Sequence, residues 1–433
     1  MHGAVVPTAP RGGVLRQAGF RLLWLANGAG DVAQQVSALA LSVTAVLVLD
    51  ATPIQVGLLT ALGFGANLVL AIPAGVWVDR WQKKRVLVGA DLLRAAAVAT
   101  VPVAHVFGVL TLAQLMVVAA ATSVAAVLFD TAHTSVLPVL VSREHVAEAN
   151  ARLQTTDNVV GVVGPGLAGQ ALRLTSGPAL YLVTAVMQLT AALLVSRLQV
   201  HEPALTHEDR EPFWPALRTG LRYVLGHPVL RSFTLVNAAI NLGAGMFMAV
   251  LPVFLLRDLA VPPSTLGLLY SAGSIGGVLG SLVALRLGRR VGEIRTKVLT
   301  TCALPAAFAA APLSTLLPGG PVPVLAAGEF GFGLLIVIGA VSTAGVRART
   351  TPARLMGRVA SAGRFVTQGA VPVGALLAGA SSTVLGNVGG LWTAAGLAGV
   401  GGLLALCSPL RTMRGLPAHL EAAGMLTPRP PPR

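Results

Sequence analysis

Residues 22–49 read LLWLANGAGDVAQQVSALALSVTAVLVL, and Asp31 is the one charged side chain among them. About 20 apolar residues in an α-helix cross the ~30 Å hydrocarbon core of a membrane, so this stretch is long enough to span it. The whole chain of 433 residues is 54% hydrophobic and 11% charged, against about 25% charged residues in soluble domains. The alternating pattern of barrel strands is absent, and helices are the other fold that satisfies its own backbone in lipid. We therefore predict an all-α membrane protein.

Eleven further apolar runs of similar length follow the first one. The six runs of the first half lie at about 22–49, 54–78, 86–110, 112–141, 155–174 and 179–198. The six of the second half lie at about 232–256, 265–287, 296–317, 322–346, 361–385 and 388–406. The sequence therefore predicts twelve transmembrane helices.

The basic residues fix the expected orientation of these helices. If the N-terminus is cytoplasmic, 28 of the 31 Lys and Arg residues fall in cytoplasmic segments, and the exceptions are Arg94, Arg173 and Arg257. Cytoplasmic loops of membrane proteins carry such an excess. We therefore expect a multi-pass protein of the bacterial inner membrane with both termini in the cytoplasm. The net charge of +15 then faces anionic membrane lipids and implies no nucleic-acid partner.

The chain also matches itself at an offset of 210 residues. Within each half the two matching polar residues are four positions apart, so they face one side of their helix. The matches in the first helix of each half are Arg21 with Arg231, Asn27 with Asn237, and Asp31 with Asn241. Two six-helix halves related by an axis along the membrane normal would give such a pattern. We predict two pseudo-symmetric bundles.

The bundles are expected at residues 21–199 and 232–408, with a cytoplasmic segment at 1–20, a linker at 200–231 and a cytoplasmic tail at 409–433. Within the linker, Leu217, Leu221, Val224 and Leu225 recur at helical spacing against Arg218 and Arg222. An amphipathic helix of this kind lies at a membrane surface. A surface helix that joins the halves is the simplest interpretation, and a regulatory docking site is the alternative.

Residues 75–85, between the second and third predicted helices, read GVWVDRWQKKR. This stretch resembles the loop signature of the major facilitator superfamily, in which a Gly, three residues, an Asp and a basic residue precede a basic cluster. Val78 and Gln82 depart from the usual Ala and Gly. The stretches DLLR at 91–94, LP at 137–138, EAN at 148–150 and GHPVLR at 226–231 resemble its bacterial drug- and siderophore-exporter branch. Enterobactin exporters and macrolide efflux pumps belong to that branch.

The resemblance implies a role in gating for the loop. In the family the loop Asp, here Asp79, bridges the two halves when the cytoplasmic side is shut, through helix-end dipoles and cationic partners. The residues that carry the motif here are Gly75, Asp79, Arg80, Lys83, Lys84 and Arg85. From the residues alone, the basic cluster has a second interpretation as a topology determinant only.

The fifth predicted helix contains GVVGPGLAG at residues 161–169. Its glycines fit a dinucleotide-binding GxGxxG fingerprint, but the strand, helix and acidic residue that such a site needs are missing. Small residues also permit close helix contact, and Pro bends a helix. Gly164, Pro165 and Gly169 resemble the fifth-helix motif of exporters in the family, and this resemblance implies export.

Ionisable residues inside the predicted helices are the other candidates. A carboxylate at the bilayer centre costs about 2.5–3.5 kcal/mol on insertion scales, so each one requires a partner or a function. Asp31 lies near mid-membrane, where it is either a proton carrier, a partner for a cationic substrate, or a carboxylate neutralised by a neighbouring helix. The further proton or ionic candidates are Asp91, Arg94, Asp130, Asp157 and Glu329.

These ionic candidates differ in the roles expected of them. Asp91 and Arg94 are spaced i, i+3, which favours a structural ion pair. Asp130 and Asp157 are expected nearer the cytoplasmic end, as closed-state contacts or as side chains that reach the headgroups. The fourth predicted helix lacks the embedded Arg that many proton antiporters of the superfamily carry.

The prediction that follows is a secondary active exporter that works by alternating access and is coupled to protons. Its small-molecule substrate would be a drug, a macrolide or a siderophore-like metabolite, in a cavity lined by Asn27, Asp31, Gln34, Asn237 and Asn241. An uptake permease, a transporter-like receptor and a lipid flippase remain alternatives. No enzyme motif, metal-ligand spacing or P-loop is found, so we expect no catalytic activity, metal or cofactor. We expect a monomer.

Overall fold

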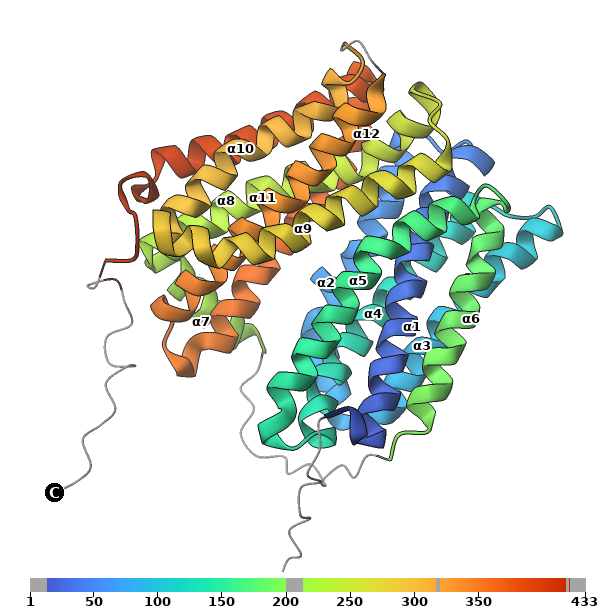
Figure 1. The fold of residues 1–433 in the computed structure, drawn as a ribbon, viewed down its shortest axis with the longest axis horizontal. Helices are drawn as coiled ribbons and strands as arrows, with labels where there is room; N and C mark the ends of the chain where they lie inside the picture. Colours follow the sequence, from blue (N-terminus) through green and yellow to red (C-terminus); the bar gives the residue numbers. More distant parts are fainter. Residues whose placement is uncertain (1–13, 200–212, 317–319, 418–419, 421–433) are drawn as a thin grey trace, which may run out of the picture.

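The computed structural model describes residues 14–199, 213–316, 320–417 and 420, and every regular element in these ranges is helical (Figure 1). The first half contains α1 (Ala18–Val43) with its π-helical end η2 (Thr44–Val48), α2 (Pro53–Arg80), α3 (Lys83–Val106), α4 (Leu112–Leu140), α5 (Val146–Ala171) and α6 (Gly177–Ser196). The second half contains α8 (Pro228–Val253) with its π-helical end η4 (Phe254–Asp258), α9 (Pro263–Val291), α10 (Glu293–Leu313), α11 (Pro321–Thr350) and α12 (Met356–Cys407). Between the halves lies α7 (Phe213–Gly226).

The long helix α12 accounts for two of the predicted spans. Its 52 residues would extend ~78 Å as one straight helix, far more than a membrane is thick. Gly386, with φ 72° and ψ 173°, breaks the helix, and only Gly adopts such angles readily. The chain therefore turns back at Gly386, between the two runs predicted at 361–385 and 388–406.

Nine of the described helices are long and apolar enough to cross a membrane. This count takes α12 once, and it considers only Pro53–Ala66 of α2, because part of that helix lies outside the description. It also omits α5, which carries the polar Glu148, Arg152 and Asp157. With α2, α5 and the second part of α12 included, the chain has the twelve spans of two six-helix bundles.

Helix boundaries recur at the same offset of 210 residues as the polar matches in the sequence. The starts of α1, α2, α3 and α5 are each followed 210 positions later by the starts of α8, α9, α10 and α12. The π-helical ends η2 and η4 obey the offset too. After them, Asp50 (φ 49°) and Ala260 (φ 47°) adopt the same left-handed conformation, which is uncommon for residues other than Gly. The internal repeat is therefore a repeat of backbone structure.

The two halves converge toward the top of Figure 1, where small residues permit close contact. A Cβ atom added at Gly169 of α5 would lie 2.8 Å from the carbonyl oxygen of Ser264 in α9. One added at Gly57 of α2 would clash with the carbonyl oxygen of Ala375 in α12. Arg257 of η4 also donates to the carbonyl oxygen of Val46 in η2, at 3.2 Å. We call this end of the molecule the far end.

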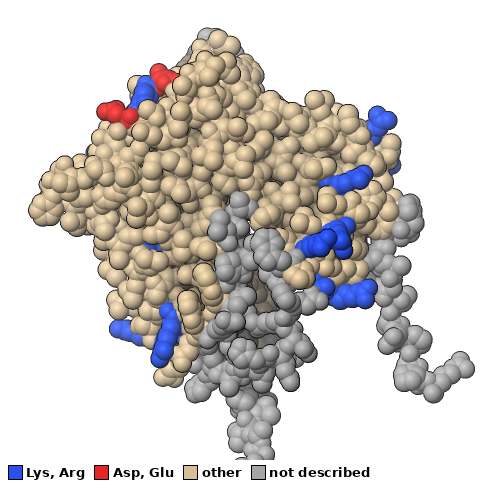
Figure 2. All heavy atoms as spheres, turned by 180° about the vertical axis from the view of Figure 1, so that it is seen from behind, with Lys and Arg blue, Asp and Glu red and all other residues tan. Residues whose placement is uncertain are grey.

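The opposite end of the bundles, which we call the basic end, carries Lys83–Arg85, Arg152 and Arg289–Arg290 at the termini of α3, α5 and α9. Figure 2 shows most Lys and Arg side chains of one face toward its lower and right-hand edges, while basic and acidic side chains lie together at the upper left; the broad surface between them carries almost no charged residues. Exposed Leu193, Leu282 and Leu403 are typical of the outward faces of spanning helices, since lipid is as apolar as they are.

The linker helix α7 packs on the second half. Leu217 and Val224 on its apolar side are buried, whereas Arg218 is exposed. The hydroxyl of Tyr223 donates to the carbonyl oxygen of Thr350 at 2.6 Å, and burial raises the pKa of this phenol. Part of the apolar side of α7 therefore contacts protein, whereas Leu225 is 52% exposed. The expected position of this helix at the membrane surface stays a prediction. The expected linker residues 200–212, the first 13 residues and the tail after residue 420 lie outside the described residues.

Candidate functional site

A cavity of ≈ 590 Å³ lies between the two halves, and six helices of the first half and three of the second contribute to its wall. This volume lies within the range of about 300–1,000 Å³ that small-molecule sites occupy. The wall is mainly apolar, with polar side chains from both halves. Those with a role below are Gln34 and Gln188, Arg94 and Asp130, and Tyr270 and Glu329.

Arg94 brings charge to the cavity from α3. Its guanidinium lies 3.8 Å from the carboxylate of Asp91 and 5.2 Å from the ring centre of Phe129 in α4. Asp91 is 1% exposed, and Arg94 and Asp130 both line the cavity. The sequence predicted the i, i+3 ion pair but missed the position of Arg94 in the cavity wall. The helix α4 carries no Arg, but Arg94 of α3 lies against Phe129 of α4.

Asp31 and Asp157 meet at one amide, between α1 and α5. The Asn27 side chain donates to Asp31 Oδ2 and to Asp157 Oδ1, at 2.9 Å in each case. Thus one amide holds two carboxylates close together. The three residues are half-buried, and Asp31 lies one helical turn from Gln35 in the cavity wall. The sequence did not predict that Asp31 and Asp157 meet.

In the second half, the equivalent helices α8 and α12 are joined by a hydrogen bond between uncharged groups. Asn241 of α8 donates to the backbone carbonyl oxygen of Thr367 in α12 at 2.8 Å, and Thr367 is 210 positions after Asp157. Each ionisable candidate of the first half likewise has an uncharged residue at the equivalent position of the second half. The residues 210 positions after Asp31, Asp91, Arg94, Asp130 and Asp157 are Asn241, Thr301, Leu304, Ala340 and Thr367.

Among the described residues, Glu329 is the acidic side chain that the second half contributes to the cavity wall. It lies in α11, against the backbone of α9, where a Cβ atom added at Gly273 would be 3.3 Å from its Oε2 atom. Phe332 lies one turn further along the same face of α11 and also lines the cavity. With Phe247 and the buried Phe308 it forms an aromatic cluster, with ring centres 4.9–6.3 Å apart.

The structure separates the five residues that were expected in the cavity wall. Gln34 lines the cavity. Asn27 and Asp31 bond to each other beside it, Asn241 bonds to α12, and Asn237 is half-buried in α8 outside the lining set. Gln188 was missed, although a polar residue inside the apolar run at 179–198 is the kind of signal that identified Asp31.

The glycine–proline motif of α5 lies at the contact between the halves. Pro165 lines the cavity. A Cβ atom at Gly164 would lie 3.0 Å from Gln35 of α1, and one at Gly169 would lie 3.0 Å from Gly267 of α9. The absence of side chains here therefore lets α5 approach one helix of its own half and one of the other half.

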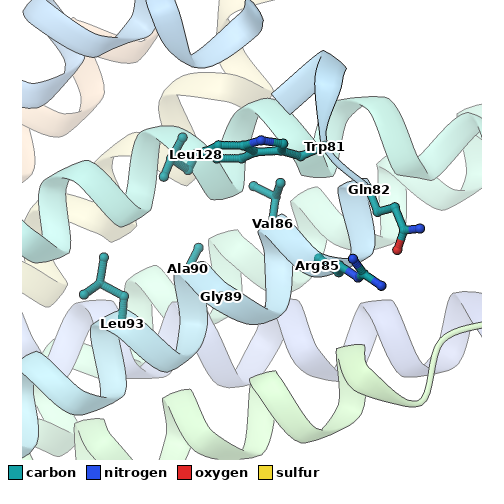
Figure 3. Close-up of a pocket in the computed structure, with 8 residues that line it drawn as sticks. All are labelled: Trp81, Gln82, Arg85, Val86, Gly89, Ala90, Leu93 and Leu128. Atoms are coloured by element: carbon teal, nitrogen blue, oxygen red, sulfur yellow. The ribbon is translucent and has the colours of Figure 1, made fainter. Parts of the chain in front are cut away.

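The loop after α2 borders a second pocket, of ≈ 470 Å³, on the α3–α4 side of the first half. The indole of Trp81 extends toward Leu128 of α4 above Val86, while Gln82 and Arg85 point to the other side (Figure 3). Lys83 and Lys84 begin α3 beside it and have interaction partners. The side chains of Gly75, Asp79 and Arg80 lie outside the described residues, and their gating role stays a prediction.

A family model described as Major Facilitator Superfamily matches residues 23–368. The chain belongs to this superfamily. It is therefore a multi-pass membrane transporter, as the loop at 75–85 indicated, and its superfamily consists of transporters rather than enzymes.

Two relatives of known activity are exporters. The multidrug efflux pump Tap of Mycolicibacterium fortuitum is 29% identical over an alignment of 327 residues that covers 72% of this chain and 76% of that protein. The enterobactin exporter EntS of Salmonella typhimurium is 24% identical over an alignment of 385 residues that covers 85% of this chain and 87% of that protein.

Solved structures agree with the fold. A bacterial homologue of the iron transporter ferroportin in an inward-facing state has a TM-score of 0.69 at 17% identity, over 92% of this chain and 100% of that one. The nucleoside transporter NupG has a TM-score of 0.72 at 14% identity, over 90% of this chain and 97% of that one. At these identities the likeness supports the twelve-helix fold alone.

Proposed function

We propose that the protein exports a small molecule of the drug, macrolide or siderophore type by alternating access, in exchange for protons. The observation that carries the proposal is the Asn27–Asp31–Asp157 cluster, which holds two carboxylates beside a cavity between two similar halves. The relatives Tap and EntS, both named as exporters, support the direction of transport.

The positive-inside rule supports a cytoplasmic basic end. The close glycine contacts between the halves lie at the far end, which would then face outward. Under this orientation the molecule is closed to the outside, as in an inward-facing state. Export requires the halves to rock apart at the far end and to close at the basic end, around the central cavity.

The proposed coupling site is the carboxylate pair of α1 and α5. Two carboxylates that accept hydrogen bonds from one amide repel each other when both are charged, so a proton on one of them relieves the repulsion. A proton that moves down 100 mV supplies about 2.3 kcal/mol. Since about 1.4 kcal/mol corresponds to a factor of ten, one proton sustains a substrate gradient of roughly 40-fold before any pH gradient is added.

Energised inside-out vesicles test this proposal. An exporter accumulates labelled drug or siderophore inside such vesicles and loses the accumulation when a protonophore is added. Accumulation in right-side-out vesicles instead identifies an uptake permease, and binding without accumulation identifies a receptor. A deletion strain tested for drug resistance and for metabolite secretion identifies the substrate.

A further inference from the structure

Glu329 places a carboxylate in the cavity wall without a matching cation from the protein. Among the residues that the structure describes, no Lys or Arg lies within ion-pair distance of it. Asp130 of α4 differs, because Arg94 lines the cavity with it and lies over the ring of the adjacent Phe129. The charge balance of the cavity is therefore unequal, and the uncompensated carboxylate belongs to the second half.

The surroundings of Glu329 are aromatic. Phe332 follows it at i+3 on the same face of α11, and Phe247 of α8 lies 6.3 Å from Phe332 between ring centres. Tyr270 of α9 lines the same cavity. A carboxylate beside aromatic rings favours an organic cation, because the carboxylate neutralises the charge and the ring faces attract it.

Anionic and neutral ligands fit this cavity wall less well than an organic cation. A carboxylate without a protein cation repels an anionic ligand, and a neutral ligand leaves a charged group desolvated when it displaces water from the cavity. A compound with a protonated or quaternary nitrogen and an apolar aromatic body satisfies both parts of the wall.

We propose that Glu329 is the specificity residue of the cavity and selects substrates that carry one organic cation. The inference rests on the proposed transport function and adds a substrate class to it. It also divides the work between the halves: the first half carries the coupling carboxylates, and the second half binds the cationic group of the substrate.

Equilibrium binding to the purified full-length protein tests the assignment without any need for transport. Tetraphenylphosphonium is the cationic probe, and triphenylphosphine oxide is a neutral compound with three of its four phenyl groups. The wild-type protein is expected to bind the cation more tightly than the neutral compound. Glu329→Gln is expected to weaken cation binding about tenfold or more, which corresponds to about 1.4 kcal/mol, and to leave binding of the neutral compound unchanged.

Two variants control for folding and for charge. Glu329→Asp keeps the carboxylate and should retain most of the preference for the cation. Glu144→Gln removes an exposed carboxylate at the basic end and should bind both probes like the wild type. Equal binding of both probes by the wild type, or full cation binding by Glu329→Gln, would overturn the assignment. If vesicles show uptake rather than export, the binding result still stands.

Discussion

In the first half, Asn27 of α1 donates to two carboxylates, one of which belongs to α5; in the second half, the equivalent α8–α12 contact is a hydrogen bond from Asn241 to a backbone carbonyl oxygen. Both arrangements join the same pair of helices at the same level. The fold therefore needs a hydrogen bond at this position but does not need the charge. We infer that the carboxylates of the first half are present for proton coupling, and each prediction below tests that difference or the contact between the halves.

The largest effect is expected from Asp31→Asn, which gives the first half the amide that the second half has. An amide still accepts the bond from Asn27 but does not exchange a proton, so protonophore-sensitive transport should fall about tenfold or more, the equivalent of at least about 1.4 kcal/mol. Transport in vesicles across a range of pH values measures this. Expression and substrate binding should be unchanged, and transport with the wild-type pH dependence would remove Asp31 from the mechanism.

A shift in conformation is expected from Gly57→Ala, at the far-end contact. The new methyl group meets the carbonyl oxygen of Ala375, and such overpacking costs about 1–3 kcal/mol. The population should therefore move toward the state that is open at the far end, by a factor of roughly 5–150. Distances between spin labels on the two halves report the shift.

Gly63→Ala on the same helix is the matched control for this change. A Cβ atom at Gly63 meets no atom within 4 Å, so the distribution of distances should stay as in the wild type. The same shift in both variants would show that the helix, and not the contact with Ala375, responds to the methyl group.

A smaller effect is expected from Asn241→Ala in the second half. The variant loses one hydrogen bond and leaves the Thr367 carbonyl without that donor, which should cost about 1–3 kcal/mol of stability. A lower melting temperature in detergent measures the loss. Coupling should persist in the transport that remains, and a loss of pH dependence here would contradict the assignment of coupling to the first half.

The smallest effect is expected from Asp50→Asn at the far end. Asp50 lies 3.6 Å from Arg257, but its side chain is 93% exposed, and pairs of this kind contribute about 0–1 kcal/mol. Arg257 keeps its bond to Val46, so transport should remain within about twofold of the wild type. A block of transport would show that the ion pair, and not the glycine packing, holds the far end closed.

Hydropathy predicted the spans well because lipid imposes a simple rule on outward-facing side chains. The predicted run at 54–78 compares with α2 at Pro53–Arg80, and that at 322–346 with α11 at Pro321–Thr350. The apolar run predicts that α5 begins at residue 155, nine residues after its start in the structure. The helix begins at Val146 with Glu148 and Arg152 in its first turns, and hydropathy does not detect a helix that extends beyond the apolar layer.

The site was less predictable, because the packing and rotation of several helices decide which side chains reach the cavity. The repeat correctly related Asn27 to Asn237 and Asp31 to Asn241 as equivalent backbone positions, but it did not reveal that Asn241 bonds to α12. Arg94 looked like a purely local partner of Asp91, since sequence spacing shows neighbours on one helix only. Its place in the cavity wall depends on how α3 is rotated against α4.

The packing of α7 has a mechanical consequence. This helix packs on α12, and Tyr223 bonds to the last residue of α11, so α7 moves with the second half. Any rocking of the two bundles therefore carries α7 along with α11 and α12 and leaves the bond between Tyr223 and Thr350 intact.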